Sequence, residues 1–399
     1  MTDRRNYLYL VVVILVMTIT MRSSNNMVIT TVPMLSEINL GFSKFLVGFI
    51  SALSYLFTFI STFYLNPRLN SSTRRRIFVI SNAVIIIMLL LYFFSDAIII
   101  WPVSAIAGLS YGMLIPNLIT SASLVNDQKA RERLISFYSV GLSLSLIVGP
   151  ALEYYILAVT GDNYREVFLY FIPIAIMGLL ASLWIKFPGD GKENRKHAMK
   201  NRALKVSILT VTTYNVPFAA LSIFLTLFAI SRFHVSGSLA YSPYIYFFSI
   251  SFATRLFMTW KPFKYIKRPL IVSIIITLFV LISFPFLPNF TSFIIVMMLL
   301  GIPHGSIFPV STIMISRGTT LEERTDVNSY FMAYNNLLFM IIPLAFGYVI
   351  RFIGYSISFM ILAIPVVITT IWLFKKYGND ETFFHKRMDV KKKGIPVKL

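Results

Sequence analysis

The sequence predicts an all-α membrane protein with twelve transmembrane helices arranged as two six-helix bundles. Of its 399 residues, 57% are hydrophobic and only 13% are charged, whereas a soluble chain of this length needs far more charge to cover its surface. The apolar residues fall in runs of about 20, the length at which a helix crosses a hydrocarbon core of ~30 Å. In addition, landmarks within residues 108–155 recur in register within residues 301–348.

The recurrence has one constant offset of 193 positions (301 − 108 = 193). The matched pairs are Gly108 and Gly301, Gly112 and Gly305, Pro116 and Pro309, Arg131 and Arg324, and Pro150 and Pro343. An offset shared over several helices indicates two similar halves. In membrane proteins this arrangement is typical of transporters whose site lies between the halves.

The apolar runs predict helices in chain order, followed by a polar tail. The first run is too long for a signal-peptide core and lacks a small-residue cleavage site, so we interpret it as a helix. The basic stretch after the sixth run contains Pro188, Gly189 and Gly191, which break any helix and predict a linker. The predicted domains are 1–186, the linker 187–203, 204–374 and the basic tail 375–399. The predicted spans are 7–31, 45–65, 77–95, 99–124, 134–158, 166–186, 204–231, 242–260, 269–288, 292–316, 328–351 and 355–374.

The basic residues predict the orientation in the membrane. The chain has a net charge of +20, and 30 of its 36 Lys and Arg lie in the N-terminus, in the tail or in the loops that the span order places on the same side. Such residues mark the cytoplasmic face, so both termini are expected in the cytoplasm and the protein in the plasma membrane. The basic patches then face anionic lipid headgroups, and no nucleic acid is expected as a partner.

Several chemistries lack sequence support. There is no cysteine, so no disulfide or thiolate site is available, and the four histidines show no paired ligand spacing. No nucleophile is placed with a base, and no phosphate-binding Gly-x-x-x-x-Gly-Lys-Ser/Thr loop occurs. We therefore expect no enzyme, cofactor or metal. A channel or receptor is not expected either, because the sequence shows no pore-loop motif and no extracellular domain.

Two motifs and the helix pattern suggest a family. Residues 66–75 align with the Gly-x-x-x-Asp-x-x-Gly-Arg-Lys/Arg loop of the major facilitator superfamily, with the basic end present and the Gly and Asp positions replaced. Gly149 and Pro150 match the start of the Gly-Pro-x-x-Gly-Gly pattern of its antiporter subgroup, whose Gly pair is replaced here. The chain resembles this superfamily over nearly its whole length. The resemblance implies a transporter whose first, fourth, seventh and tenth helices line a central cavity.

A polar stripe surrounds an arginine in the first helix. Thr18, Arg22, Asn26 and Thr30 recur every four residues, with Asn25 beside them, so they share one helix face. Arg22 lies 15 residues into the run, about 22 Å from its inner end and near the midplane. An arginine facing lipid there costs ~3 kcal/mol or more, so the stripe should face protein or water. Arg22 is a candidate for bidentate binding of an anionic substrate, or for a structural ion pair.

Two further charges lie in predicted spans. Glu153, in the fifth run, is a candidate carrier of a coupling proton, a structural partner of Arg22 or Arg255, or a solvated residue near the outer interface. Arg255, in the eighth run, is either a second cation in the pathway or a side chain that reaches the cytoplasmic interface.

The remaining candidate substrate contacts are polar side chains in later spans. His304 could carry a proton, although the Gly301 and Gly305 around it also fit plain helix packing. Each of the others is also explained by a hydrogen bond between helices. They are Asn117, Tyr214, Asn215, Asn335 and Asn336.

The function that follows is secondary active transport by alternating access, coupled to an ion, which we expect to be the proton. An intramembrane arginine with few acidic residues favours a small organic anion or phosphate ester as substrate. The alternative is a proton-coupled efflux pump for amphipathic compounds, favoured by the many aromatic residues. It is disfavoured because the first and fourth spans carry no carboxylate. A monomer is expected.

Overall fold

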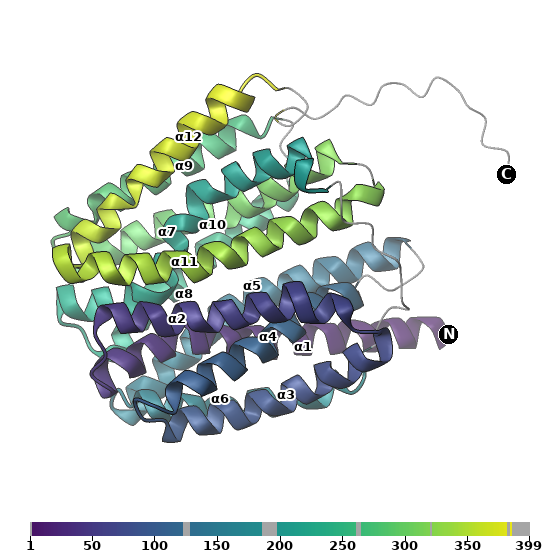
Figure 1. The fold of residues 1–399 in the computed structure, drawn as a ribbon, viewed down its shortest axis with the longest axis horizontal. Coiled ribbons are helices and arrows are strands. Elements are labelled where there is room, and N and C mark those ends of the chain that lie inside the picture. The colour runs from purple at the N-terminus through teal and green to yellow at the C-terminus, as the bar shows by residue number, and fades with distance from the viewer. Residues whose placement is uncertain are drawn as a thin grey trace.

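The protein consists of helices throughout the residues that the structure describes, which are 2–122, 128–185, 198–260, 265–319, 321–380 and 384 in a computed structural model. The linker predicted at 187–203 and the tail predicted at 375–399 lie largely outside these residues. Figure 1 shows the helices running roughly parallel in one bundle. They are α1 (Thr2–Met34), α2 (Lys44–Phe59), α3 (Ser71–Phe94), α4 (Ile100–Ala122), α5 (Gln128–Thr160), α6 (Tyr164–Ser182), α7 (Arg202–Phe233), α8 (Gly237–Trp260), α9 (Lys267–Ser283), α10 (Phe290–Gly318), α11 (Leu321–Ile361) and α12 (Ala363–Tyr377).

Short irregular helices extend or join these elements. A π-helix continues α1 over Leu35–Asn39, and another continues α2 over Ile60–Leu65. α11 is interrupted at Gly354, whose φ of 72° is left-handed, so the span predicted at 355–374 is the end of α11 followed by α12. Short 3-10 turns complete the chain at Asn66–Arg68, Ala198–Lys200 and Phe284–Phe286.

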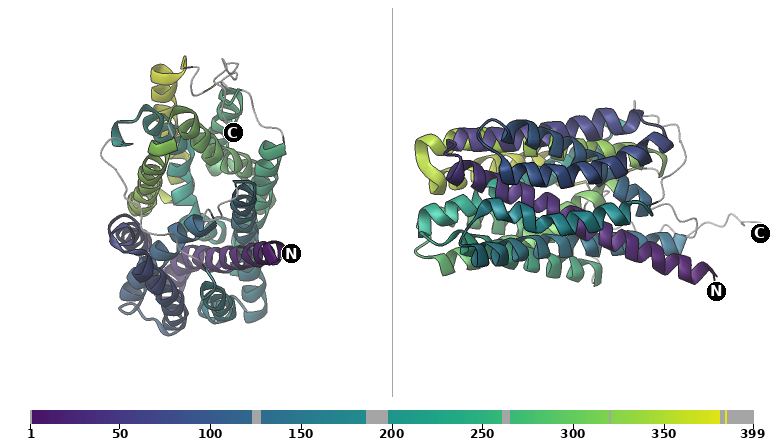
Figure 2. Two further views of the ribbon diagram at one scale, coloured as in Figure 1. Left: turned by 90° about the vertical axis from the view of Figure 1, so that its right-hand side faces the viewer. Right: turned by 90° about the horizontal axis from the view of Figure 1, so that it is seen from below.

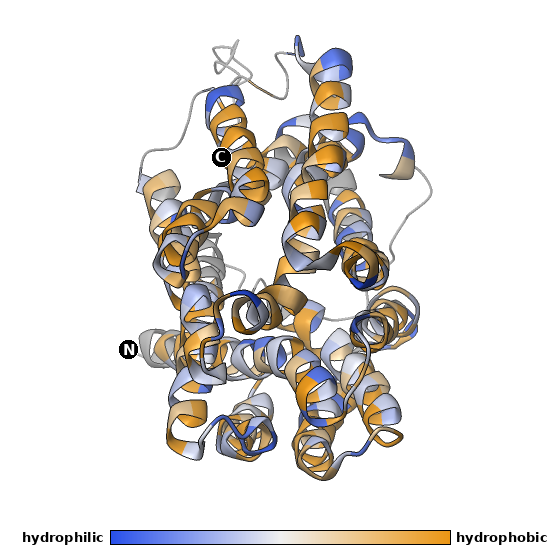
Figure 3. Cartoon of the chain, turned by 90° about the vertical axis from the view of Figure 1, so that its left-hand side faces the viewer, coloured by the Kyte–Doolittle hydropathy of each residue, from blue (hydrophilic) through white to orange (hydrophobic). Residues whose placement is uncertain are grey.

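The helices are apolar and long enough for a membrane. Within the described residues, nine stretches have the length and composition of a membrane span. α8 is not among them because its Ser, Tyr, Pro and Arg residues lower its hydropathy, and 330–377 counts as a single stretch across Gly354. Apolar residues cover most of the helical turns (Figure 3). Large side chains exposed on the outside of α12 illustrate a surface suited to lipid, namely Ile364, Ile368, Ile371 and Trp372.

Apart from α2 and α11, whose largest contact is with each other, the helices of α1–α6 pack mainly among themselves, as do those of α7–α12. α1 packs against α5 and α6, and α3 against α4 and α6, while α7 packs against α11 and α12, and α9 against α10 and α12. The main contacts between the two groups join α2 to α11, α5 to α8 and α1 to α7. Figure 2, left, views the bundle along its helices, with the early helices below and the late helices above.

Equivalent glycines bring two pairs of helices into backbone contact. A Cβ at Gly108 of α4 would lie 2.3 Å from the carbonyl oxygen of Ser54 on α2. A Cβ at Gly301 of α10 would lie 2.5 Å from the carbonyl oxygen of Phe247 on α8. Ser54 and Phe247 are themselves 193 positions apart, as are the two glycines. The glycines are therefore architectural at both sites, because any side chain would separate the helices.

Substitution of these glycines should be costly in both places. Gly108→Ala and Gly301→Ala should each destabilise the protein, since relief of such overpacking costs ~1–3 kcal/mol and exceeds the helix propensity that alanine gains, ~1 kcal/mol. Gly149→Ala is the control, because its Cβ would meet nothing nearer than 3.5 Å. Thermal unfolding midpoints in detergent should fall by several degrees for the first two variants only. A fall of the same size for Gly149→Ala would contradict the explanation.

Candidate substrate and coupling site

The polar stripe on α1 carries two donor atoms that have no hydrogen-bond partner among the residues that the structure describes. Arg22 is half-buried, and its Nε is buried without a hydrogen-bond partner. Asn26, one turn further along, has a buried Nδ2 that also lacks a partner. Thr18, by contrast, donates to the carbonyl of Ile14 at 2.6 Å. Buried donors are nearly always satisfied in folded proteins, so Arg22 and Asn26 mark a place where a ligand or water would bind.

A second arginine lies near the first. Arg255 of α8 donates from Nη1 to Oγ of Ser143 on α5 at 3.2 Å, so it bridges the two groups of helices. Its charge also interacts with that of Arg22. Arg22 interacts as well with Tyr55 of α2 and Tyr138 of α5. The structure thus gathers two cations and two phenols between α1, α2, α5 and α8.

His304 of α10 lies in a cage of aromatic rings on the α7–α12 side. Its ring centroid is 4.4 Å from that of Phe218 and 4.9 Å from that of Phe247. Tyr214 and Phe248 complete the cage at 5.6 and 5.4 Å. Both ring nitrogens of His304 and the hydroxyl of Tyr214 are buried without hydrogen-bond partners. His304 also interacts electrostatically with Arg255, which places the cage near this arginine.

Glu153 of α5 is fully buried and is held by hydroxyl groups. Its Oε1 accepts hydrogen bonds from Thr30, and from Thr31 at 2.8 Å, both on α1. Its Oε2 is buried without a partner. Among the described residues Glu153 therefore forms no ion pair with Arg22 or Arg255. Of the interpretations given to Glu153 from the sequence, the structural ion pair and the solvated position both disagree with this geometry.

The asparagines occupy different environments. Asn117 donates to Oδ1 of Asn66 at 2.8 Å, which ties α4 to the turn after α2. Asn215 of α7 donates to Oδ1 of Asn335 on α11, a hydrogen bond between buried helices. Asn25 is half-buried beside Arg22 on α1. The contacts of Asn117 and Asn215 match the interhelical alternative considered for them.

Sequence reasoning missed several members of the site. Single Phe or Ser residues in apolar spans give no signal above the background of a membrane helix. The four-residue spacing that identified Arg22 does not include Thr31, which lies next to Thr30. The missed residues are Thr31, Tyr55, Tyr138, Ser143, Phe218, Tyr241, Phe247 and Phe248.

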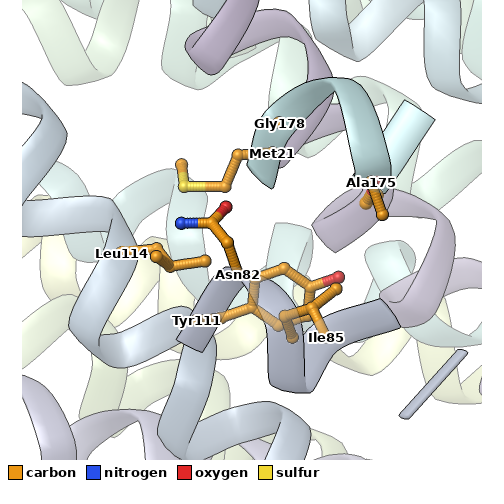
Figure 4. A pocket seen from close by; sticks show the side chains of 8 residues that line it. Met21, Asn82, Ile85, Tyr111, Leu114, Ala175 and Gly178 are labelled. Carbon is orange, nitrogen blue, oxygen red and sulfur yellow. The ribbon is translucent and has the colours of Figure 1, made fainter. Parts of the chain in front are cut away.

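A separate cavity lies inside the first group of helices. It is small and partly open to solvent, and it is bounded by α1, α3, α4 and α6. Figure 4 shows Asn82 and Tyr111 facing it, with Met21 opposite. The hydroxyl of Tyr111 is buried without a hydrogen-bond partner, as is that of Ser24, which also lines the cavity. No charged residue lines the cavity, so its chemistry differs from that around Arg22.

Polar contacts join the two groups of helices at the ends opposite the start of α1. Asp162, between α5 and α6, accepts hydrogen bonds from the backbone N–H groups of Gly237 and Ser238 at 2.7 and 2.6 Å. These N–H groups begin α8, so the carboxylate caps a helix of the other group. At the same end, a second contact is made by Lys44 of α2, which donates to Glu37 at 2.8 Å and to Tyr355 of α11 at 3.2 Å. Both contacts hold the groups together at this end.

Comparison with known proteins identifies the class to which this arrangement belongs. A family model of the Major Facilitator Superfamily matches residues 14–292 and 258–392. The chain therefore belongs to the Major Facilitator Superfamily, as the sequence predicted, and is a multi-pass membrane transporter. No curated protein sequence matches it significantly.

Solved structures of other transporters share the fold. A bacterial homologue of the human lysosomal transporter Spinster, inward-facing and occupied, has a TM-score of 0.70 at 14% identity, with 97% of this chain and 99% of that chain covered. Its inward-facing, unoccupied form gives 0.71 at 16% identity, with 96% and 99% covered. A mutant of the nucleoside transporter NupG gives 0.66 at 12% identity, with 92% and 99% covered. Identities this low establish the fold alone, which is consistent with secondary transport by alternating access.

Proposed function

We propose that the protein is a secondary active transporter that moves a small organic anion or phosphate ester, coupled to the proton. The observation that carries the proposal is the buried Nε of Arg22 without a partner, beside a second arginine and away from the buried carboxylate Glu153. A guanidinium binds carboxylate and phosphate bidentately, and a low-dielectric site strengthens that interaction. Asn25, Asn26, Tyr214 and His304 are the further proposed contacts, Arg255 supplies the second charge, and Asn117 and Asn215 support the helices that carry the site.

The proposed architecture is two six-helix halves, 1–186 and 204–374, that rock about the site between them. The contact pattern supports it. With six helices in each half, α2 corresponds to α8 and α5 corresponds to α11, so the contact of α2 with α11 is equivalent to the contact of α8 with α5. The backbone gives further support. The left-handed residues Gly41 and His234 are 193 positions apart, as are Gly161 and Gly354. Twelve crossings follow if α4 and α8 also cross and the stretch 330–377 crosses twice, turning at Gly354.

We propose that the protein lies in the plasma membrane, with both termini and the 187–203 linker in the cytoplasm. The basic-residue distribution supports it. Reporter fusions at Asn194 and Leu399 should both report cytoplasm, and one at Gly161 the opposite side. Different results at Asn194 and Leu399 would mean an odd number of crossings in the second half.

Binding and counterflow experiments test the substrate class. Purified protein should show higher unfolding midpoints with small carboxylates or phosphate esters than with sugars or organic cations, since a ligand that binds only the folded state stabilises it. Liposomes preloaded with the best anion should then take up its labelled form by counterflow. A preference for organic cations, with none for anions, would overturn the proposal.

The second candidate is proton-coupled efflux of amphipathic compounds. The cage of Phe218, Phe247, Phe248 and Tyr214 around His304 favours it, because aromatic faces bind apolar and cationic groups. The nearby arginines disfavour a cationic cargo. The same ligand panel separates the candidates.

A further inference from the structure

Among the described residues, the hydrogen-bond partners of the buried Glu153 carboxylate are hydroxyl groups of α1. Thr30 and Thr31 donate to its Oε1, and the hydroxyl of Thr31 is 3.3 Å from that of Tyr241 on α8. Tyr241 also donates to the carbonyl of Thr30 at 3.3 Å. All four residues are buried, with Glu153, Thr31 and Tyr241 at 0% exposure. The cluster therefore joins α1 and α5 to α8, where the two proposed halves meet.

The internal repeat provides a natural comparison for this cluster. Adding 193 positions to Thr31 and Glu153 gives Phe224 and Phe346. These two rings are buried and lie 5.4 Å apart between α7 and α11. The same helix contact is thus an aromatic pair in one half and a hydroxyl–carboxylate pair in the other. Packing at this position does not require an acid, and a buried acid without an ion pair is costly, so Glu153 serves another purpose.

The charged groups around the cluster are distant or already bonded. Tyr241 and Tyr244 of α8 are the titratable groups that interact with Glu153. Along α1, Arg22 precedes Thr30 by eight residues, about 12 Å. Along α8, Arg255 follows Tyr241 by fourteen residues, about 21 Å. Towards the other end of α8, Asp162 is bonded to the N–H groups of Gly237 and Ser238, and Tyr164 of α6 interacts with Tyr241.

We propose that Glu153, Thr30, Thr31 and Tyr241 form the binding site for the coupling proton, whose carboxylate has no equivalent in the second half because Phe346 stands at that position. The inference rests on the proposed function and assigns its coupling step to residues. The two threonine hydroxyls occupy Oε1, which leaves Oε2 to take and release the proton. Because Thr31 also contacts Tyr241, a change of charge on Glu153 alters a contact between α1 and α8. Proton occupancy is thereby linked to the relative position of the two halves.

Infrared spectroscopy of the full-length protein in liposomes, without substrate, tests the site. The wild type should show a protonated-carboxyl C=O band that disappears on titration and is missing from Glu153→Gln. Phe346→Leu, which alters the equivalent position in the other half, and Asp162→Asn should both retain it. Thr31→Val and Tyr241→Phe keep the carboxylate and should shift the pH midpoint of the band.

A band unchanged in Glu153→Gln overturns the proposal. If Glu153→Gln does not fold, midpoints unaltered by Thr31→Val and Tyr241→Phe overturn it.

A second arm distinguishes the proton from Na⁺, which also prefers oxygen ligands. The unfolding midpoint should be equal in NaCl, KCl and choline chloride of the same ionic strength. A rise specific to Na⁺ that Glu153→Gln abolishes would overturn the proton assignment in favour of sodium. Both arms omit the substrate, so failure of the anion panel and failure of this site give different results.

Discussion

Arg22→Lys is expected to fold normally and to lose anion binding. An ammonium keeps the charge but cannot reproduce the planar fork that a guanidinium presents to a carboxylate or phosphate. A charge-assisted hydrogen bond contributes ~1.5–3 kcal/mol, so affinity for the best anion should fall about ten- to a hundredfold. The measurement is the midpoint shift produced by that anion, together with counterflow. The matched control is Arg165→Lys, because Arg165 donates to the carbonyls of Phe93 and Ser95 near the end of α3 and lies outside the site.

A double mutant separates binding from a structural charge pair. If Arg22 only balanced Glu153, Arg22→Met combined with Glu153→Gln should restore both stability and uptake. The geometry predicts no such recovery, because Thr30 and Thr31 hold the carboxylate and no ion pair joins it to Arg22. Recovery of transport by the double mutant would contradict the binding role of Arg22.

Features set by local periodicity could be predicted from the sequence. Runs of apolar residues predicted an all-helical membrane protein, and the two motifs with the helix pattern resembled this family; both expectations are confirmed. The four-residue spacing placed Arg22 and Asn26 on one face of α1, and both have buried donors without partners. The spacing of glycines indicated close helix contacts, which the structure places between α4 and α2 and between α10 and α8.

Features set by the packing of distant helices could not be predicted. The contact between Thr31 and Glu153 depends on how α1 and α5 are rotated about their axes, which no pattern within either helix determines. Tyr241 joins them from α8, more than 200 positions along the chain from Thr31. The aromatic cage of His304 is equally non-local, since Phe residues are common in every span. The number of crossings stays a prediction, because α8 is too polar for composition to identify it as a span and 330–377 counts as one stretch across Gly354.

Asp162→Asn is expected to favour an open state, in which the contact of residue 162 with the start of α8 is broken, over the closed state in which it is made. Its carboxylate accepts two N–H groups from the first turn of α8, and charge at a helix N-terminus is stabilising. Asparagine tolerates the left-handed φ of 62° at this position, so the change removes the charge without added backbone strain. A loss of ~1–2 kcal/mol from the closed state would shift its ratio to the open state roughly five- to thirtyfold. The contact of Lys44 with Tyr355 remains, so the shift should be partial.

Spin labels can measure this shift because the chain contains no cysteine of its own. Val159→Cys on α5 and Leu239→Cys on α8 are exposed positions close to the contact, and their distance distribution should gain a longer component in Asp162→Asn. Asp96→Asn is the control. Asp96 accepts the N–H groups of Ile98 and Ile99 at 2.8 and 2.7 Å, which is the same chemistry within α1–α6. Its removal should lower stability and leave the distances unchanged. If both variants lengthen the distance equally, the effect is general loosening. A longer component confined to Asp162→Asn would mean that this carboxylate, by capping a helix of the other half, controls how often the transporter opens.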